Sequence, residues 1–173
     1  MYRPTIAIDA IGLDDPVAIE IALENMSDVL MAVVSINRRY MRHFPSRIPL
    51  LYESGVRYDR LDPVGDTCGD DDFQDVVTIL EHPDHPGLGD CDDLACYRIA
   101  ELNERYRVEA VPYIRLYADR VFSDGAMRPR HLYHILVRWP EGLAEYPETV
   151  HQDPETGALL EDPSKELGMT GEA

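Results

Sequence analysis

The chain lacks any hydrophobic run long enough to cross a membrane. A membrane-spanning helix needs roughly 20 consecutive apolar residues, and no stretch of the 173 residues approaches that length. The first residues, MYRPTIAIDAIGLDDP, also lack the basic and apolar segments of a secretory signal. We therefore expect a cytoplasmic protein, or one that is packaged without signal-dependent export.

Cysteine is scarce as well. Cys68, Cys91 and Cys96 are an odd number, and they are too few for a disulfide framework in a chain of this length. We expect reduced thiols, so each cysteine has to be judged by its local chemistry.

Lysine is almost absent, because the 16 basic residues are 15 arginines and Lys165. The 33 acidic residues give a formal net charge of −17, which repels phosphate groups. This composition is consistent with a GC-rich genome or with an acidic surface suited to high salt. We predict no nucleic-acid partner, no membrane partner and no cofactor.

The residues that are present predict a single α+β domain. Apolar spacing predicts helical structure over 15–42, as one helix or two, ending before Pro45. Residues 45–75 are expected to form a loop, and a short helix is expected at 74–81. A second helix is expected at 92–106, with Leu94 and Ile99 among its apolar residues.

Strands are expected mainly after the helices. Residues 111–122 and 131–140 alternate apolar and polar side chains, and a turn region at 123–130 separates them, so they predict an antiparallel hairpin. Shorter strands are expected at 4–9 and 157–161. We expect the chain after Met169 to be frayed.

The segment GLGDCDDLA (87–95) is the most informative for chemistry. Glycines make a tight turn there, and a helix is expected to begin at or just after Cys91. The positive end of a helix favours a thiolate, which is the nucleophilic form. The flanking Asp90, Asp92 and Asp93 oppose it by their charge, so a small buried structural cysteine is the competing interpretation.

A thiol nucleophile needs a base, which a third group holds in place. His134 lies in the apolar stretch LYHILV, on the same face as Leu132 and Leu136, and is either a core histidine or a base. His131 is a weaker candidate. Asp162, before Pro163, is the preferred third group over Asp153, although it is also a common strand terminator.

Three segments together, GDCDDLACYRIAELN, YHILVRWPEG and LEDPSKELGM, resemble a group of transglutaminase-like, papain-type thiol proteins found among tailed-virus (bacteriophage) structural genes. The stretch LLYESGVRYDR (50–60) is similar to the segment that precedes the nucleophile in that group. The resemblance covers roughly residues 50–169. It implies that Cys91 is the nucleophile, His134 the base and Asp162 the orienting acid.

The resemblance further implies a nucleophile-bearing helix packed on a small antiparallel sheet within residues 46–169. Residues 1–45 would be a packing or docking segment, and 170–173 a frayed tail. The implied activity is that of a cysteine peptidase or a transglutaminase-like acyl-transfer enzyme. The implied partners are other virion proteins or a peptide substrate, and the implied location is the host cytoplasm or the virion. A second oxyanion donor is needed, with Tyr52 or Gln74 as guesses.

Two alternatives stay open. The chain could be a non-catalytic virion connector on the same fold, in which case Cys91 would be inert to thiol reagents. It could also hold zinc through His82, His85 and Cys91, with Asp90 or Cys68 as fourth ligand. Both histidines precede prolines in a loop, which disfavours the zinc site, so the preferred prediction is that no metal binds.

Overall fold

The structure, a computed structural model, describes residues 16–58, 73–83, 86–123, 126–140, 142, 144–145 and 147. For Pro16 and for residues 116–123 and 126–133 only the backbone is described. The strands predicted at 4–9 and 157–161, and the tail after Met169, lie outside the described residues.

The N-terminal helix α1 (Pro16–His43) is continuous, which confirms the helix predicted over 15–42 and selects one helix over two. Pro16 suits the first position because the N–H it lacks would have no partner inside the helix. The helix ends two residues before Pro45, since a residue before proline avoids helical geometry. The inner face of α1 is buried along Met26, Leu30, Val33, Val34 and Met41.

The segment between the long helices contains more structure than the predicted loop over 45–75. A 3-10 turn η1 (Leu51–Glu53) and a strand β1 (Arg57–Tyr58) lie there, so the prediction of loop is wrong at these residues. Strand β1 pairs in parallel with β2 (Leu88–Gly89). The short helix α2 (Val76–Glu81) confirms the helix predicted at 74–81. The β1–β2 pair fixes the glycine-containing turn immediately before Cys91.

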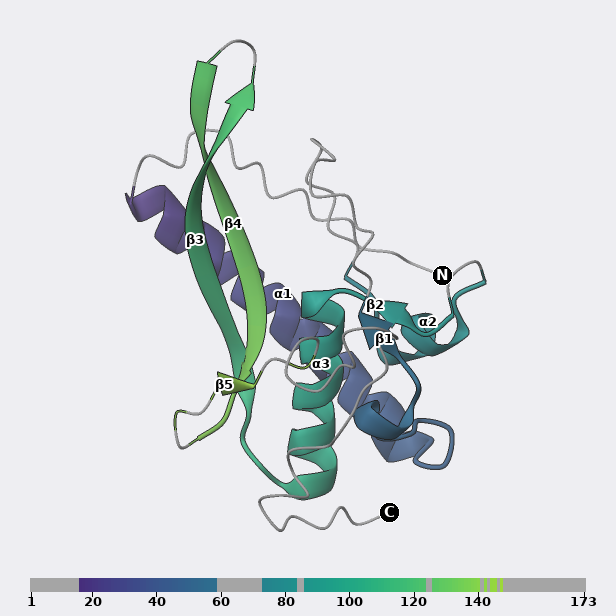
Figure 1. Cartoon of the computed structure of the whole chain (residues 1–173). Helices are drawn as coiled ribbons and strands as arrows, with labels where there is room; N and C mark the ends of the chain where they lie inside the picture. Colours follow the sequence, from purple (N-terminus) through teal and green to yellow (C-terminus); the bar gives the residue numbers. More distant parts are fainter. Residues whose placement is uncertain are drawn as a thin grey trace.

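The central helix α3 (Cys91–Glu101) continues into a π-helical turn η2 (Leu102–Tyr106). The helix predicted at 92–106 is confirmed, but its last turn is wider than an α-helix. Every residue from Asp92 to Glu101 is buried, because α3 packs against both α1 and the strand β4. Helix α3 is therefore the core of the molecule rather than an amphipathic surface helix (Figure 1).

The predicted antiparallel hairpin is confirmed as β3 (Val111–Ser123) and β4 (Ala126–Arg138), with β5 (Ala144–Glu145) on the other side of β4. The predicted turn at 123–130 is too long, because Ser123 already pairs with Ala126. Proline and glycine signals in SDGAMRPR suggested a loop, but Pro129 is accommodated within β4 opposite Arg120.

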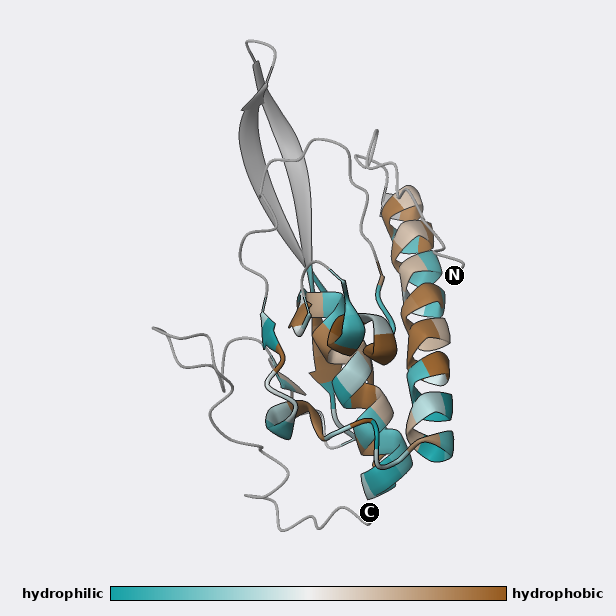
Figure 2. Ribbon diagram, turned by 90° about the vertical axis from the view of Figure 1, so that its right-hand side faces the viewer, coloured by the Kyte–Doolittle hydropathy of each residue, from teal (hydrophilic) through white to brown (hydrophobic). Residues whose placement is uncertain are grey.

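One hydrophobic core joins these elements, so the architecture is α+β as predicted. It contains the inner face of α1, most of α3, and Ile135, Val137 and Trp139 from the end of the sheet. Figure 2 shows α1 along one side of the molecule, with α3 beside it. Among the described helices, none is both long and apolar enough to span a bilayer.

Candidate functional site

Cys91 is the first residue of α3, and the turn before it is closely fixed. Asp90 caps the helix by accepting a hydrogen bond from the N–H of Asp93, and Asp93 accepts one from the N–H of Asp90 in return. This reciprocal capping box sets where the helix begins. Glycine suits position 89, because a Cβ atom there would lie 3.1 Å from Cβ of Asp93, which is a tight contact.

The position of Cys91 suits a reactive thiol better than that of Cys96. Cys91 is half-buried, and the helix N-terminus directs backbone N–H groups and partial positive charge toward its end of α3. Cys96 is buried, its Sγ donates to the carbonyl oxygen of Leu30 at 3.6 Å, and burial raises its thiol pKa. Of these two thiols, Cys91 is the candidate nucleophile.

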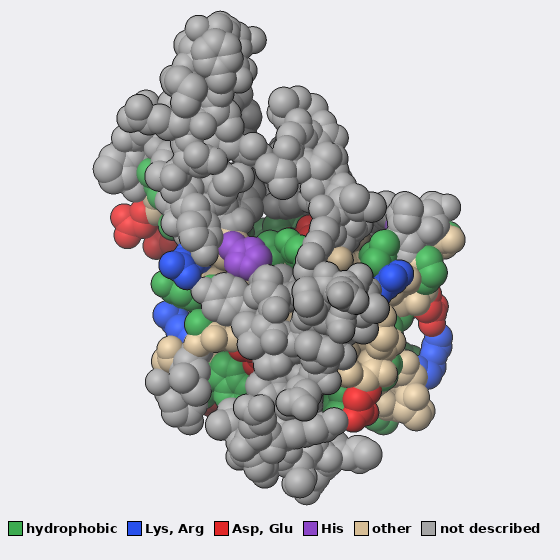
Figure 3. All heavy atoms as spheres, in the orientation of Figure 1, with side chains coloured by type: hydrophobic (Ala, Val, Ile, Leu, Met, Phe, Trp, Pro, Cys, Tyr) green, Lys and Arg blue, Asp and Glu red, His purple; other side chains and the backbone are tan. Residues whose placement is uncertain are grey.

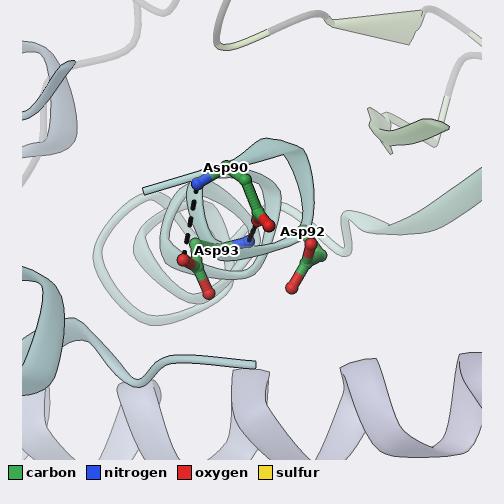
Figure 4. A group of neighbouring side chains, drawn as sticks. All are labelled: Asp90, Asp92 and Asp93. Carbon is green, nitrogen blue, oxygen red and sulfur yellow. Dashed lines mark hydrogen bonds between the residues drawn. The ribbon is translucent and has the colours of Figure 1, made fainter. Parts of the chain in front are cut away.

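Three carboxylates surround the start of the helix. Asp90, Asp92 and Asp93 each place an oxygen within 4.8 Å of the others, and Figure 4 shows Asp92 standing to one side of the hydrogen-bonded pair formed by Asp90 and Asp93. Asp93 also accepts the backbone N–H of Gln74 at 2.7 Å. Two of the acids therefore hold the local fold, while Asp92 has no such capping bond.

Asp92 is the exceptional member of this cluster. It is 4% exposed, and its Oδ2 atom is buried without a hydrogen-bond partner in the described part of the chain. Burial, together with the neighbouring charges of Asp90 and Asp93, raises the Asp92 pKa well above its ordinary value. A neutral Asp92 removes one of the three charges that oppose thiolate formation at Cys91. The same oxygens are of the type that a hard divalent cation prefers.

His134 is half-buried on β4, where it stands opposite Arg115 of β3. Alternation along the strand puts it on the face of Leu136, opposite Ile135 and Val137, which enter the shared core. Helix α3 packs against β4, so the candidate thiol and the candidate base lie on two neighbouring elements. On the face that Figure 3 draws, the acidic and basic side chains of described residues lie at separate places and do not gather into one patch.

The other predicted site residues are only partly covered by the structure. Asp162 and Asp153 lie outside the described residues, and of His131 only the backbone is described, opposite Ala118. The triad of Cys91, His134 and Asp162 therefore stays a prediction.

The two guessed oxyanion donors differ clearly. The hydroxyl of Tyr52 donates to Glu145, and burial next to that carboxylate raises the Tyr52 pKa. The Tyr52 hydroxyl is therefore already used in a hydrogen bond within the fold. Gln74 lies beside the first turn of α3 through its N–H bond to Asp93, and its side-chain NH2 group is the part that can donate a hydrogen bond. Gln74 is the better candidate.

The zinc alternative receives no support from the residues described. His82 follows α2 as its C-cap, and His85 and Cys68 lie outside the described ranges. Within those ranges, the only group of three or more potential ligands is Asp90, Asp92 and Asp93. His82, Cys91 and Asp90 do not form one.

Sequence reasoning missed a buried charge cluster at the other end of α3. Arg98 donates to Glu101 and, at 2.9 Å, to Glu145 of β5, and Trp139 donates to the same Glu145 at 2.8 Å. Because β5 is only two residues long, no periodicity could have marked Glu145. We call Arg98, Glu101 and Glu145 the buried ion cluster.

Comparison of the chain with protein-family models, with curated proteins and with solved structures finds no match in any of the three.

Proposed function

We propose that this chain is a cysteine-dependent acyl-transfer or amide-hydrolysing protein, with Cys91 as the nucleophile, His134 as the base and Asp162 as the group that orients the base. The observation that carries the proposal is the half-buried thiol at the capped N-terminus of a buried helix that packs against the histidine-bearing strand. The sequence resemblance supports the same assignment.

The proposed chemistry is that of a thiol acyl-transfer enzyme. His134 accepts the thiol proton, and the Cys91 sulfur attacks the carbonyl carbon of an amide. N–H groups at the start of α3, with the side-chain amide of Gln74, supply hydrogen bonds to the oxyanion. His134 then gives its proton to the leaving amine. Water or a second amine releases the acyl group from sulfur, which distinguishes a peptidase from a cross-linking transferase.

We also propose that the α+β fold is transglutaminase-like. A transglutaminase-like domain has a nucleophile-bearing helix against an antiparallel sheet, and α3 packed on β4 of the β3–β4–β5 sheet is consistent with it. We propose a tailed-virus origin, and other virion proteins or a peptide as partners, on the sequence resemblance alone.

The proposal is tested by the rate of alkylation of the thiols by iodoacetamide as a function of pH, with the labelled residue identified by mass spectrometry. A Cys68→Ser background leaves only Cys91 and Cys96. We expect labelling of folded protein at Cys91 and protection of Cys96, because Cys96 is buried. We expect His134→Gln to shift the pH profile upward by about one unit or more, which slows labelling near neutral pH about tenfold.

His82→Gln is the matched control, since it removes a described histidine from another element and should leave the profile unchanged. If Cys91 is inert in folded protein, or if His134→Gln leaves the profile unchanged, the enzyme proposal fails. The alternative of a non-catalytic virion connector on the same fold would then be preferred.

A further inference from the structure

Helix α1 packs on one side only. Its buried residues all lie on one face of the helix, at about 100° per residue: Met26, Leu30, Val33, Val34, Asn37 and Met41. Exposed residues follow the opposite side over the length of the helix, and those closest to its midline are Val17, Glu20, Ile21, Glu24, Asp28, Met31, Ala32, Ser35, Arg39 and Arg42. We call these ten residues the outer face of α1. In Figure 2, the other described helices lie on one side of α1. The hydrophobic core of one copy therefore does not use the outer face.

The outer face is partly apolar. Val17 is 60% exposed, Ile21 52% and Met31 39%, which is high for apolar side chains that share one side of a helix. Ala32 and Ser35, near the middle of the helix, are small, so a second helix can approach closely there. An exposed face that combines apolar and small residues at helical spacing is suited to contact with another helix.

The charges of α1 are separated along its length. The acidic residues of the helix are Glu20, Glu24 and Asp28, and they precede all of its basic residues, which are Arg38, Arg39, Arg42 and His43. The helix dipole favours acids near the start and bases near the end, but its effect falls off within the first and last turns. Glu24 and Asp28 lie more than two turns from Pro16, where α1 begins. The dipole therefore does not account for them.

We infer that the outer faces of α1 in two copies of this chain pack against each other in antiparallel orientation. Antiparallel packing places the acidic half of each helix opposite the basic half of the other, so α1 is complementary in charge to a second copy of itself. A contact between identical surfaces closes as a two-fold dimer. The inference is independent of the thiol chemistry.

The spacing of the residues sets the register of this contact. With the two-fold axis near Met31, Glu24 lies opposite Arg39 of the second copy. Asp28 then lies opposite Ser35, and Met31 meets its own copy at the centre. Each helix is about 42 Å long, so the apolar centre and the charged flanks fit within one contact.

Other occupants fit the outer face less well. A parallel second copy would place acid against acid and arginine against arginine, and like charges repel. A nucleic acid would meet the three carboxylates of the acidic half, and the formal charge of −17 on the whole chain also repels phosphates.

The test is sedimentation velocity of the full chain over a range of concentrations, at about 150 mM salt, where charges more than about 8 Å apart are largely screened. Repulsion between the acidic surfaces is then reduced, while charges in contact still act. We expect a reversible dimer. Glu24→Arg with Asp28→Arg should weaken it at least about tenfold, because arginine then faces arginine. Ser35→Glu with Arg39→Glu should weaken it by a similar factor.

The decisive measurement mixes these two variants. Reversed charges on one copy meet reversed charges on the other, so the mixture should form a 1:1 dimer about as stable as the wild-type dimer. All four substituted residues are exposed. The substitutions also leave Arg38 and Arg42 in place, which bind Glu104 within one copy.

The matched control is Glu53→Arg with Glu109→Arg. It makes the same change in net charge as Glu24→Arg with Asp28→Arg, at two exposed positions outside α1, and should dimerise like wild type. Circular dichroism checks that each variant is folded.

Cross-linking tests the antiparallel orientation. A background with Cys68→Ser and Cys91→Ser leaves only Cys96, which is buried. Met31→Cys in that background should form a disulfide-linked dimer with oxidised glutathione, because the two copies of residue 31 lie near the two-fold axis. Ile21→Cys should not, because its two copies would be about 30 Å apart along the helices.

A wild-type chain that stays monomeric at every concentration overturns the inference. So does weakening in the control as large as in the variant with Glu24→Arg and Asp28→Arg, or failure of the two folded variants to form a mixed dimer. Equal cross-linking through Ile21→Cys and Met31→Cys would overturn the antiparallel orientation.

Discussion

The two ends of α3 hold buried charges in different ways. Toward the C-terminal end, Arg98 and Glu101 of the buried ion cluster are fully buried. Each carboxylate of this cluster has a donor, because the N–H of Leu51 donates to Glu101 at 2.6 Å and Trp139 donates to Glu145. At the N-terminal end, Asp92 is almost as deeply buried, but one of its oxygens has no partner in the described part of the chain.

This difference separates a structural role from a functional candidate. The buried ion cluster ties α3, the turn η1 and the strand β5 together, so the fold itself explains why it exists. A buried carboxylate without a full set of partners destabilises a fold. Strained or perturbed groups of this kind concentrate at functional sites, and Asp92 is adjacent to the candidate nucleophile.

The largest effect is expected when the buried ion cluster loses its cation. Arg98→Met should lower the free energy of unfolding by about 3–5 kcal/mol, because Glu101 and Glu145 would remain buried without their cation. Urea denaturation at neutral pH measures the change. Restoring neutrality with Glu101→Gln and Glu145→Gln in the same chain should recover part of the loss.

The matched control is Arg47→Met, which breaks an exposed ion pair with Glu81, 2.8 Å long, in which both side chains are more than half exposed. Surface pairs contribute little, so we expect a change within about 0.5 kcal/mol. Equal losses in Arg98→Met and Arg47→Met would mean that the buried ion cluster does not hold the fold.

Sequence patterns predicted the helices and strands correctly where the periodic segments were long. The 28 residues of α1 and the alternating strands of the hairpin were found, because their periodicities extend over many residues. The two-residue strands β1, β2 and β5 were missed, since two residues are too few to show an alternating pattern. The hairpin was predicted too short because SDGAMRPR was taken as a turn region. Pro129 instead lies within β4, where β4 pairs with β3 and, among the described residues, has no β5 partner.

Asp92, at the N-terminal end of α3, gives the next prediction. The Asp92 pKa is raised above its ordinary value of 3.8, so the folded state favours the protonated carboxyl. Its contribution to stability is therefore fully present below about pH 3.8 and is lost as the pH rises through the folded-state pKa. Asp92→Asn keeps the shape without the charge and should be more stable than wild type by about 1–2 kcal/mol at pH 8.

Urea unfolding in the presence of a chelator, at pH 3.5 and pH 8, measures this effect. The advantage of Asn should vanish at the lower pH. Asp28→Asn on the exposed side of α1 is the control and should change stability by no more than about 0.5 kcal/mol at either pH. An Asp92→Asn variant that is less stable than wild type at pH 8 would show that the carboxylate is ionised and compensated.

The sequence located the start of α3 and the thiol there, because a glycine turn followed by capping acids is a local signal. Tyr52 and Gln74 were only guesses for a second oxyanion donor, and of the two it is Gln74 whose N–H donates to Asp93 in the first turn of α3. It did not distinguish Asp92 from Asp90 and Asp93, since three adjacent acids look alike until burial is known. The buried ion cluster was invisible, because Arg98 and Glu145 are 47 residues apart.

The smallest effect concerns the ion pair of Glu104 with Arg42, which is less buried than the buried ion cluster. Glu104, in η2, accepts from Arg42 at 2.8 and 2.7 Å and from Arg38 at 3.2 Å. Chiefly the hydrogen bond from Arg42 lowers the Glu104 pKa from 4.5 to about 2. The stability it contributes is therefore present above about pH 4.5 and is lost as the pH falls toward 2.

Because Arg42 is largely exposed, solvent screens this interaction, and we expect Glu104→Gln to cost only about 1 kcal/mol at pH 7. The cost should disappear near pH 2 and shrink in 0.5 M salt, in contrast to the loss in Arg98→Met, which salt should hardly change because that cluster is buried. Glu81→Gln, in the exposed pair with Arg47, is the control with the smaller change. A Glu104→Gln cost that is unaffected by salt would place Glu104 with the buried ion cluster, and α1 would then be held to the end of α3 as firmly as β5 is.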